Sequence, residues 1–286
     1  MWKTRTVSRY PDTSNNQSNG VKTVKFTKMQ GLGNDYVYIN CFEEKVDHPS
    51  ELAIRISDRH FGIGSDGLVL IRPCETADFE MKMYNADGSE AEMCGNASRC
   101  IGKYVYERGL TGRKEITLKT GAGIKRLMIR EENGKAASVR VDMGKPEVES
   151  IRETIVAGGR PYTITRVSTG NPHAVIFVDN ADEYDVHTIG KLIENHPAFP
   201  NRTNVEFATV IDRSHIRMRV WERGSGETLA CGTGACATLT AAAVNGLTEE
   251  KAVLKLNGGD LLIELKDGIV YQEGPAEFVF DGELAE

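Results

Sequence analysis

The sequence predicts an α/β (α+β) fold of two pseudo-symmetric halves, each a barrel-like, mostly antiparallel sheet around a buried central helix. Three observations support this prediction. From Val24 onward the chain is mostly short strands separated by turns, with only two or three helical segments. The order of strands and helices in the first half recurs in the second. The helix expected after Cys231 is apolar nearly all round, so it must be buried.

In the first half, a helix is predicted from Ser50, as its capping residue, to about Arg59. A second helix follows from the spacing of apolar residues after Ala97, and Gly109 is its expected C′ residue. Strands are predicted at 24–30, 36–40, 79–83, 116–118, 124–129 and 139–143.

The second half repeats this order. A helix is predicted at 185–195, and the apolar helix after Cys231 ends near Gly246. Strands are predicted at 163–167, 174–178, 205–210, 216–220, 252–256, 261–265 and 277–280. Because sequence identity between the halves is low, the duplication is inferred from pattern alone.

These elements suggest an N-terminal domain of residues 23–135, to which residues 275–286 return, and a C-terminal domain of residues 136–274. Residues 1–22 are expected to be a disordered leader, because 13–20 are polar and low in complexity.

The composition limits the classes of ligand and of cysteine site that the protein could have. Hydrophobic residues make up 40% and charged residues 27%, which is typical of a globular protein. The net charge of −6 argues against nucleic acid or an anionic membrane as partner. The six cysteines include no Cys-x2-Cys pair, so neither a disulfide scaffold nor a structural zinc site is predicted. We expect free thiols, a cytoplasmic location, no metal and a small-molecule ligand.

Two cysteines stand out from the other four, which are expected to be structural. Cys94 and Cys231 each follow a polar, Gly-containing turn, and each opens a predicted helix. A helix N-terminus lowers the pKa of a thiol and attracts an anion. Two such ends facing each other could hold one carboxylate and place a thiol on either side of the neighbouring carbon.

Other polar residues lie in turns near these motifs. His173 follows a Gly-Asn-Pro turn, and Glu222 with Arg223 follows a strand just before the second thiol. The imidazole of His173 or the carboxylate of Glu222 could take a proton from a thiol. The ordinary alternatives are a structural role for His173 and a solvated ion pair for Glu222 and Arg223. Four turn asparagines would suit a polar ligand with several hydrogen bonds: Asn34, Asn85, Asn171 and Asn204.

Several motifs together resemble the diaminopimelate epimerase family, cofactor-independent enzymes of lysine and peptidoglycan precursor synthesis. They are GLGNDY (31–36), DRHFGIGSDG (58–67), NADGSEAEMCGN (85–96), GNPH (170–173), ERGSGETLACGTGA (222–235) and GPA (274–276). The resemblance extends from about Val24 to the C-terminus.

The resemblance implies a two-domain fold with the active site in the interdomain cleft, no cofactor, and a homodimer. It implies that Cys94 and Cys231 are the thiolate base and thiol acid, with His173 and Glu222 as their partners. Residues expected to hold the reacting carboxylate are Gly95, Asn96, Gly232 and Thr233. Residues expected to read the distal amino-acid end are Asn34, Asn85, Asn171, Asn204 and Arg223. Gly67 departs from the pattern, since some relatives carry a polar side chain there.

Two alternatives remain at this point. A proline-type racemase of the same fold also uses two cysteines, although the asparagines and Arg223 favour a substrate with two amino-acid ends. A thiol redox or binding protein is a function of another class, because paired thiols of low pKa oxidise readily.

Overall fold

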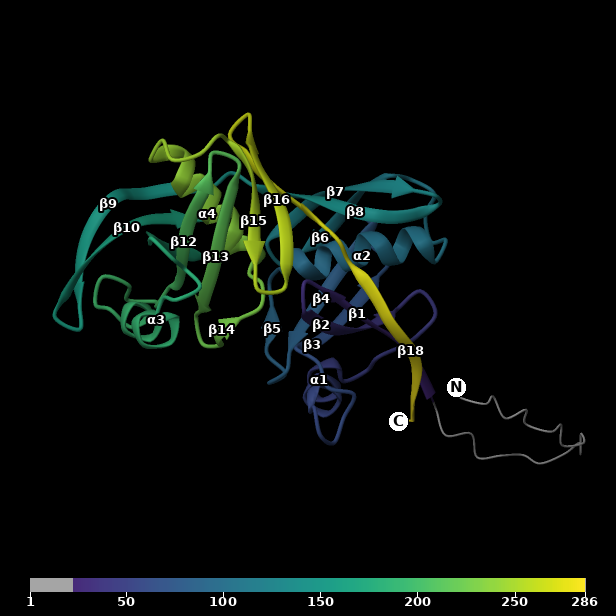
Figure 1. Cartoon of the computed structure of the whole chain (residues 1–286). Helices are drawn as coiled ribbons and strands as arrows, with labels where there is room; N and C mark the ends of the chain where they lie inside the picture. The colour runs from purple at the N-terminus through teal and green to yellow at the C-terminus, as the bar shows by residue number, and fades with distance from the viewer. Residues whose placement is uncertain (1–22, 286) are drawn as a thin grey trace, which may run out of the picture.

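The computed structural model describes residues 23–285, which form two strand-rich halves (Figure 1). The leader predicted at residues 1–22 lies outside the described residues. Within residues 23–285, none of the helices combines the length and apolar character that crossing a membrane would need.

The first half contains two helices, α1 (Pro49–Ser57) and α2 (Gly95–Glu107). Its strands are β1 (Thr23–Gly31), β2 (Asn34–Asn40), β3 (Gly67–Arg72), β4 (Phe79–Asn85), β5 (Glu90–Ala91), β6 (Glu115–Thr120), β7 (Gly123–Glu132) and β8 (Lys135–Gly144). Gly109 has a φ of 74° just beyond α2, as a C′ glycine requires, so the predicted end of this helix is confirmed.

The second half contains α3 (Val186–Glu194) and α4 (Gly232–Val244). Its strands are β9 (Glu147–Ala157), β10 (Arg160–Ser168), β11 (Pro172–Phe177), β12 (Asn204–Asp212), β13 (His215–Glu222), β14 (Gly226–Thr228), β15 (Lys251–Leu256), β16 (Gly259–Lys266) and β17 (Ile269–Gly274). The last strand of the chain, β18 (Glu277–Ala285), leaves this half.

The predicted duplication is confirmed by the pairing of the strands. In the first half, the parallel pair β2–β3 is connected through α1, and the parallel pair β4–β6 through α2. In the second half, the parallel pairs β11–β12 and β13–β15 are connected through α3 and α4 in the same way. The other pairings are antiparallel. Each half therefore has the same sequence of crossovers, and α2 and α4 occupy equivalent positions.

The two equivalent helices form the centre of the hydrophobic core. In α4, the residues from Ala235 to Ala242 are all buried, as its apolar sequence predicts. Strands surround α4 in the second half, and α2 packs on β1, β7 and β8 in the first (Figure 1). The barrel-like character of each half follows from this wrapping.

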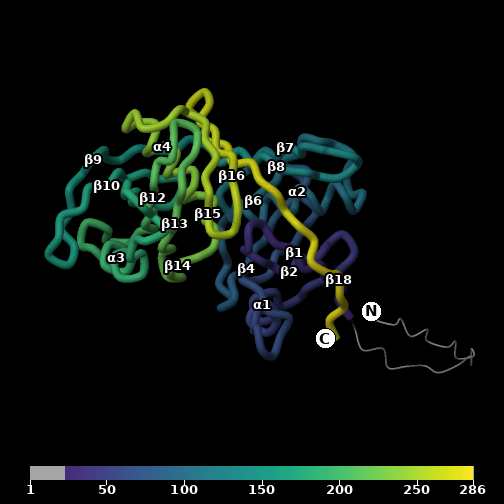
Figure 2. The backbone as a smooth tube through the Cα atoms, viewed as in Figure 1, coloured from purple at the N-terminus to yellow at the C-terminus, as the bar shows by residue number. Residues whose placement is uncertain are grey.

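Two strand pairings join the halves. β8 pairs with its equivalent β17. β18 crosses back to pair with β1 (Figure 2). The domain boundaries at 135 and 274 stay a prediction, because the strands form one continuous 18-stranded sheet.

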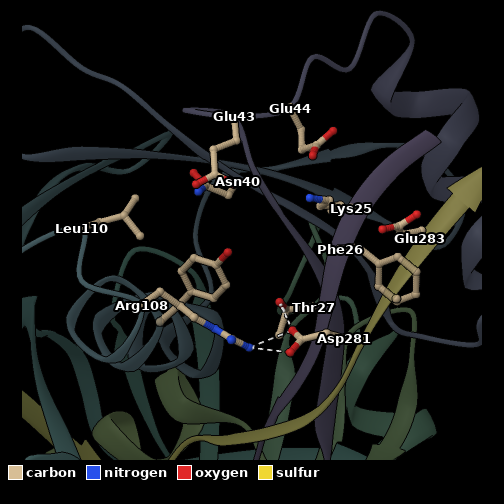
Figure 3. Close-up of a pocket in the computed structure, with 12 residues that line it drawn as sticks. Lys25, Phe26, Thr27, Asn40, Glu43, Glu44, Arg108, Leu110, Asp281 and Glu283 are labelled. Atoms are coloured by element: carbon tan, nitrogen blue, oxygen red, sulfur yellow. Dashed lines mark hydrogen bonds and ion pairs between the residues drawn. The ribbon is translucent and has the colours of Figure 1, made fainter. Parts of the chain in front are cut away.

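Side chains beside a small cavity of about 460 Å³ help to hold β18 in the first half (Figure 3). Arg108, at the end of α2, donates to both oxygens of Asp281 on β18 at 2.7 and 2.8 Å. Thr27 on β1 donates to the same carboxylate at 2.6 Å. The charged groups at this end of the cavity thus bind one another.

The prediction that Ser50 caps α1 is wrong. His48 precedes the helix, Pro49 occupies its first turn, where proline is favoured, and Ser50 is already helical. The Ser50 hydroxyl instead donates to the carbonyl of Gly88 at 2.7 Å, and so ties α1 to the turn after β4.

Candidate active site

A cleft of about 1750 Å³ is lined by residues of both halves. It contains the start of α2 and the start of α4. The predicted site residues that line it are Cys94, Cys231, Glu222, Asn34, Asn85, Gly95, Asn96, Asn171, Arg223, Gly232 and Thr233. His173 and Asn204 are buried and take no part in its lining.

Both thiols occupy the N-cap position of their helices, as predicted. Cys94 and Cys231 have extended backbones, with φ of −138° and −117°, and helical geometry begins at the following glycine. The first backbone N–H groups of a helix have no partner within it, so each thiol lies beside several free donors. Both helix N-termini therefore present positive potential to the same cleft, where a carboxylate would be stabilised.

Cys94 lies in a network of amide side chains. Its sulfur donates to Asn34 Oδ1 at 3.3 Å, and Asn96 Nδ2 donates to the same oxygen at 3.3 Å. Asn34 is oriented in turn because its Nδ2 donates to Asp66 at 2.8 Å. The Asn34 oxygen thus connects the thiol to a fixed hydrogen-bond chain.

Cys231 lies beside hydroxyl and carboxyl groups. Its Sγ accepts from the N–H of Gly234 at 3.4 Å and contacts the Thr233 hydroxyl at 3.4 Å. It also lies near the Glu222 carboxylate, whose negative charge raises the pKa of this thiol and which accepts a hydrogen bond from Thr228. Glu222 is therefore placed to exchange a proton with this thiol, whereas Cys94 has an amide neighbour.

The expectation that the helix termini lower the thiol pKa values is wrong as a net result. Burial raises the pKa of Cys94, although the backbone N–H groups of Ala97 and Asn96 oppose the shift. Burial, and then the negative charges of Glu222 and Glu206, raise the pKa of Cys231 well above its usual range. Desolvation of the thiolate outweighs the helix ends, because surrounding protein atoms bury Cys231 and half-bury Cys94.

His173 is not in contact with a thiol in this arrangement. Its Nδ1 lies 2.7 Å from Glu206 Oε1, and its Nε2 lies 3.0 Å from Asn171 Oδ1. Neither His173 nor Glu206 has an exposed side chain. Asn171 lines the cleft and donates to Thr233 at 3.4 Å, so His173 reaches the thiol of Cys231 only through this side chain and Thr233.

Asn204 has a different place from the one predicted. Its Nδ2 donates to the carbonyl of Pro172 at 2.9 Å, and its Oδ1 accepts from the N–H of Arg223 at 3.0 Å. Both ends of the amide join the start of β11 to the turn after β13, so this side chain holds the cleft wall together, and its contact with a ligand stays a prediction. Arg223 donates to the carbonyl of Asn201 at 3.1 Å, and Asn85 to Ser89 at 3.0 Å.

Gly67 cannot be replaced by a residue that reaches the cleft. A Cβ built there overlaps the carbonyl oxygen of Tyr84, because β3 and β4 approach closely at this point. The polar group at this end of the cleft is Asp66, which the sequence interpretation missed. Asp66 and Asp35 both bind Arg59, at 2.9 and 2.8 Å. Asp66 directly precedes Gly67 in the GSDG motif (64–67), and this position is the signal by which Asp66 could have been found.

The other four cysteines do not line the cleft. Cys100 and Cys236 are buried, as expected of structural thiols, whereas Cys41 and Cys74 are partly exposed. Within residues 23–285, no three His, Cys, Asp or Glu side chains are grouped closely enough to hold a metal ion.

Comparison with known proteins identifies the family. The family model described as diaminopimelate epimerase matches residues 26–149 and 165–279. The diaminopimelate epimerase of Acetivibrio thermocellus is 56% identical over 275 residues, which cover 91% of this chain and 98% of the relative. The chain belongs to the diaminopimelate epimerase family. Another family member, from Methanococcus maripaludis, is 53% identical over 91% of this chain and 99% of its own.

Solved structures confirm the fold of the family in this chain. A probable proline racemase of Agrobacterium radiobacter aligns with a TM-score of 0.72 at 17% identity, over 92% of this chain and 93% of the other. A phenazine biosynthesis protein of the PhzF family from Bacillus anthracis aligns with the same TM-score at 16% identity, over 92% and 99%. The family model and the curated relatives confirm the resemblance drawn from the sequence motifs, and the chain is an epimerase.

Proposed function

We propose that the chain interconverts LL- and meso-2,6-diaminopimelate without a cofactor, through the thiols of Cys94 and Cys231. One observation carries this proposal: the two thiols are the N-caps of two equivalent helices that open on one cleft. A carboxylate bound by both helix ends would have its α-carbon between the two sulfurs. One thiolate then removes the α-proton while the other thiol delivers a proton to the opposite face.

The arrangement supplies what this reaction needs. The α-proton of an amino acid is weakly acidic, and negative charge develops on the α-carbon and its carboxylate as the proton leaves. Backbone N–H groups at Gly95, Asn96, Gly232 and Thr233 are fixed before the reaction, so they stabilise that charge with little reorganisation. Cys231 is buried and Cys94 is half-buried, so the exclusion of water from this part of the cleft strengthens these interactions.

The partners of the two thiols differ in this proposal. Glu222 holds and exchanges the proton of Cys231, because both side chains line the same part of the cleft and the charge of Glu222 acts on this thiol. His173 acts through Asn171, to which its Nε2 is bonded. Asn34, Asn85 and Arg223 line the rest of the cleft and would bind the distal amino and carboxylate groups.

Hydrogen exchange at the α-carbon tests the proposal directly. Purified protein in D2O, given LL- or meso-diaminopimelate, is expected to incorporate deuterium at the α-carbon and to form the other stereoisomer. NMR follows the deuterium, and chiral chromatography follows the isomers. L-Proline under the same conditions is the control, and exchange with proline but not with diaminopimelate would contradict the assignment. The family and its relatives favour the first outcome over a proline-type racemase or a thiol redox protein.

We propose that the active form is a cytoplasmic homodimer that binds neither nucleic acid nor membrane. Val279 and Phe280 on β18 are 54% and 46% exposed, and exposed apolar side chains on this strand suit contact with a second copy. Light scattering is expected to give twice the chain mass of 31.5 kDa. Val279→Lys together with Phe280→Lys should give the single mass, and a wild-type protein that already has the single mass would contradict the proposal.

A further inference from the structure

Beneath the two thiols, the helix N-termini are separated by a buried carboxamide. Gln272 is on β17 and is fully buried. A Cβ built on Gly95 would overlap the Gln272 amide nitrogen, and one built on Gly232 would overlap its amide oxygen. The first residues of α2 and α4 therefore contact the two ends of one side chain.

Arg99 holds this carboxamide in place. Its Nη1 lies 3.4 Å from Gln272 Oε1, and its Nε donates to the carbonyl of Pro275 at 3.2 Å. The other side of the amide lies 3.1 Å from the sulfur of Met143. Since an amide oxygen must face the guanidinium, this contact fixes which end of Gln272 meets each helix.

The guanidinium of Arg99 carries an uncompensated charge. Arg99 is 0% exposed, and its Nη2 has no hydrogen-bond partner. Among the ion pairs of residues 23–285, none includes Arg99, and the groups around it are Cys94, Cys100, Cys236 and Tyr38. A buried cation without a carboxylate is costly, and arginine stays protonated at neutral pH. Its positive potential is therefore felt within the core near the start of α2.

We propose that Arg99 and Gln272 are positioning residues of the epimerase, in which Gln272 sets the separation of the two helix N-termini and Arg99 supplies positive potential behind Cys94. This inference rests on the proposed function for its catalytic meaning. Neither residue lines the cleft, so neither touches a substrate bound there. They act through the positions of Gly95 and Gly232 and through the charge state of the Cys94 thiol.

The charge of Arg99 acts on one thiol more than on the other. The titratable and charged groups that face Cys94 are Arg99 and Cys100 on α2, Tyr36 and Tyr38 on β2, and Glu222 at the end of β13. Arg99 is the cation of this set, and it opposes the rise that burial causes in the pKa of Cys94. Around Cys231, the main charges are the carboxylates of Glu222 and Glu206.

The test measures the reactivity of Cys94 without any substrate. In a Cys231→Ser background, the rate of alkylation by iodoacetamide is followed from neutral to alkaline pH, and peptide mass mapping assigns the modified cysteine. Arg99→Gln is expected to raise the apparent pKa of Cys94 by about one unit, which is about tenfold less thiolate below that pKa. Arg99→Lys keeps the charge and should largely restore the profile.

Gln272→Glu tests the effect of the Arg99 charge by placing an opposite charge next to the guanidinium. The introduced carboxylate meets the Arg99 guanidinium and both helix N-termini, so we expect a similar upward shift and a fall in kcat/KM for diaminopimelate. Gln272→Met, of similar length but uncharged, is the matched control and should shift the profile less. Circular dichroism establishes which variants fold. If Arg99→Gln does not fold, the result for Gln272→Glu alone decides the test.

An unchanged alkylation profile in folded Arg99→Gln or Gln272→Glu would overturn the inference. A loss of activity in step with the melting temperature, without a change in thiol reactivity, would also overturn it, since that is the behaviour of a purely structural residue. The two proposals can be tested separately. The proposed function is contradicted by absence of deuterium exchange into diaminopimelate, whereas the alkylation rates are measured without substrate and test only the roles of Arg99 and Gln272.

Discussion

Replacement of either Cys94 or Cys231 by serine is expected to lower epimerisation of diaminopimelate by about 10³-fold. A hydroxyl is a far weaker acid than a thiol, so it neither removes the α-proton nor returns one at a useful rate. Each variant retains one thiol, and that thiol faces one side of the α-carbon. Residual deuterium exchange should therefore be limited to one stereoisomer, with opposite preferences in the two variants.

The experiment compares initial exchange rates of LL- and meso-diaminopimelate in D2O for both serine variants and the double variant. Cys41→Ser is the matched control, because Cys41 is a partly exposed cysteine outside the cleft. It should behave as wild type. Two single variants with the same stereoisomer preference would show that the thiols do not act on opposite faces.

Replacement of Glu222 by glutamine is expected to lower kcat by about 10²-fold and to raise the melting temperature at neutral pH by about 2 °C. Burial raises the pKa of Glu222, although hydrogen bonds from Thr228 and Cys231 oppose the shift. A raised folded-state pKa means that the folded protein holds this proton more tightly than the unfolded chain. The contribution of Glu222 to the free energy of unfolding is therefore most favourable at low pH, and it is lost as the pH rises through the folded-state pKa.

Glutamine removes this pH-dependent cost but cannot accept the proton of Cys231. The gain in melting temperature should consequently disappear below the ordinary pKa of a glutamate, where both proteins carry a neutral side chain. Glu249→Gln is the control, since Glu249 is exposed and paired with Arg213 at 2.6 Å. Full activity in Glu222→Gln, or lower stability than wild type at neutral pH, would contradict the role given to this carboxylate.

Much of the fold follows from local patterns in the sequence. The helices at both thiols are marked by turns, small residues and apolar spacing, and their terminal glycines Gly109 and Gly246 both have positive φ. Five strands were missed. Two of them, β5 (Glu90–Ala91) and β14 (Gly226–Thr228), are too short to show an alternating pattern, and the other three were missed for different physical reasons. β3 (Gly67–Arg72) is apolar on both faces and lacks alternation, and β9 (Glu147–Ala157) is largely exposed. β17 (Ile269–Gly274) has a polar residue at an inward position.

The site residues that lie in turns or at helix starts could be predicted from the sequence. Asn204 and His173 have buried side chains, and each has a partner that is distant in the sequence, Arg223 for Asn204 and Glu206 for His173. Glu206 lies within an apolar strand and gave no local sign that it would pair with His173. Gln272 could have been found, because it alternates with Val270 and Gly274 on the buried side of its strand.

The pairing of β18 with β1 also governs how this protein is made. Synthesis proceeds from the N-terminus, so β1 emerges early and β18 last, with nearly the whole molecule between them. One edge of β1 therefore stays open during translation, while the rest of the first half can already collapse around α2. Open strand edges pair readily with other chains. The edge of β1 that β18 covers is thus open to such pairing until the last strand of the chain has been made.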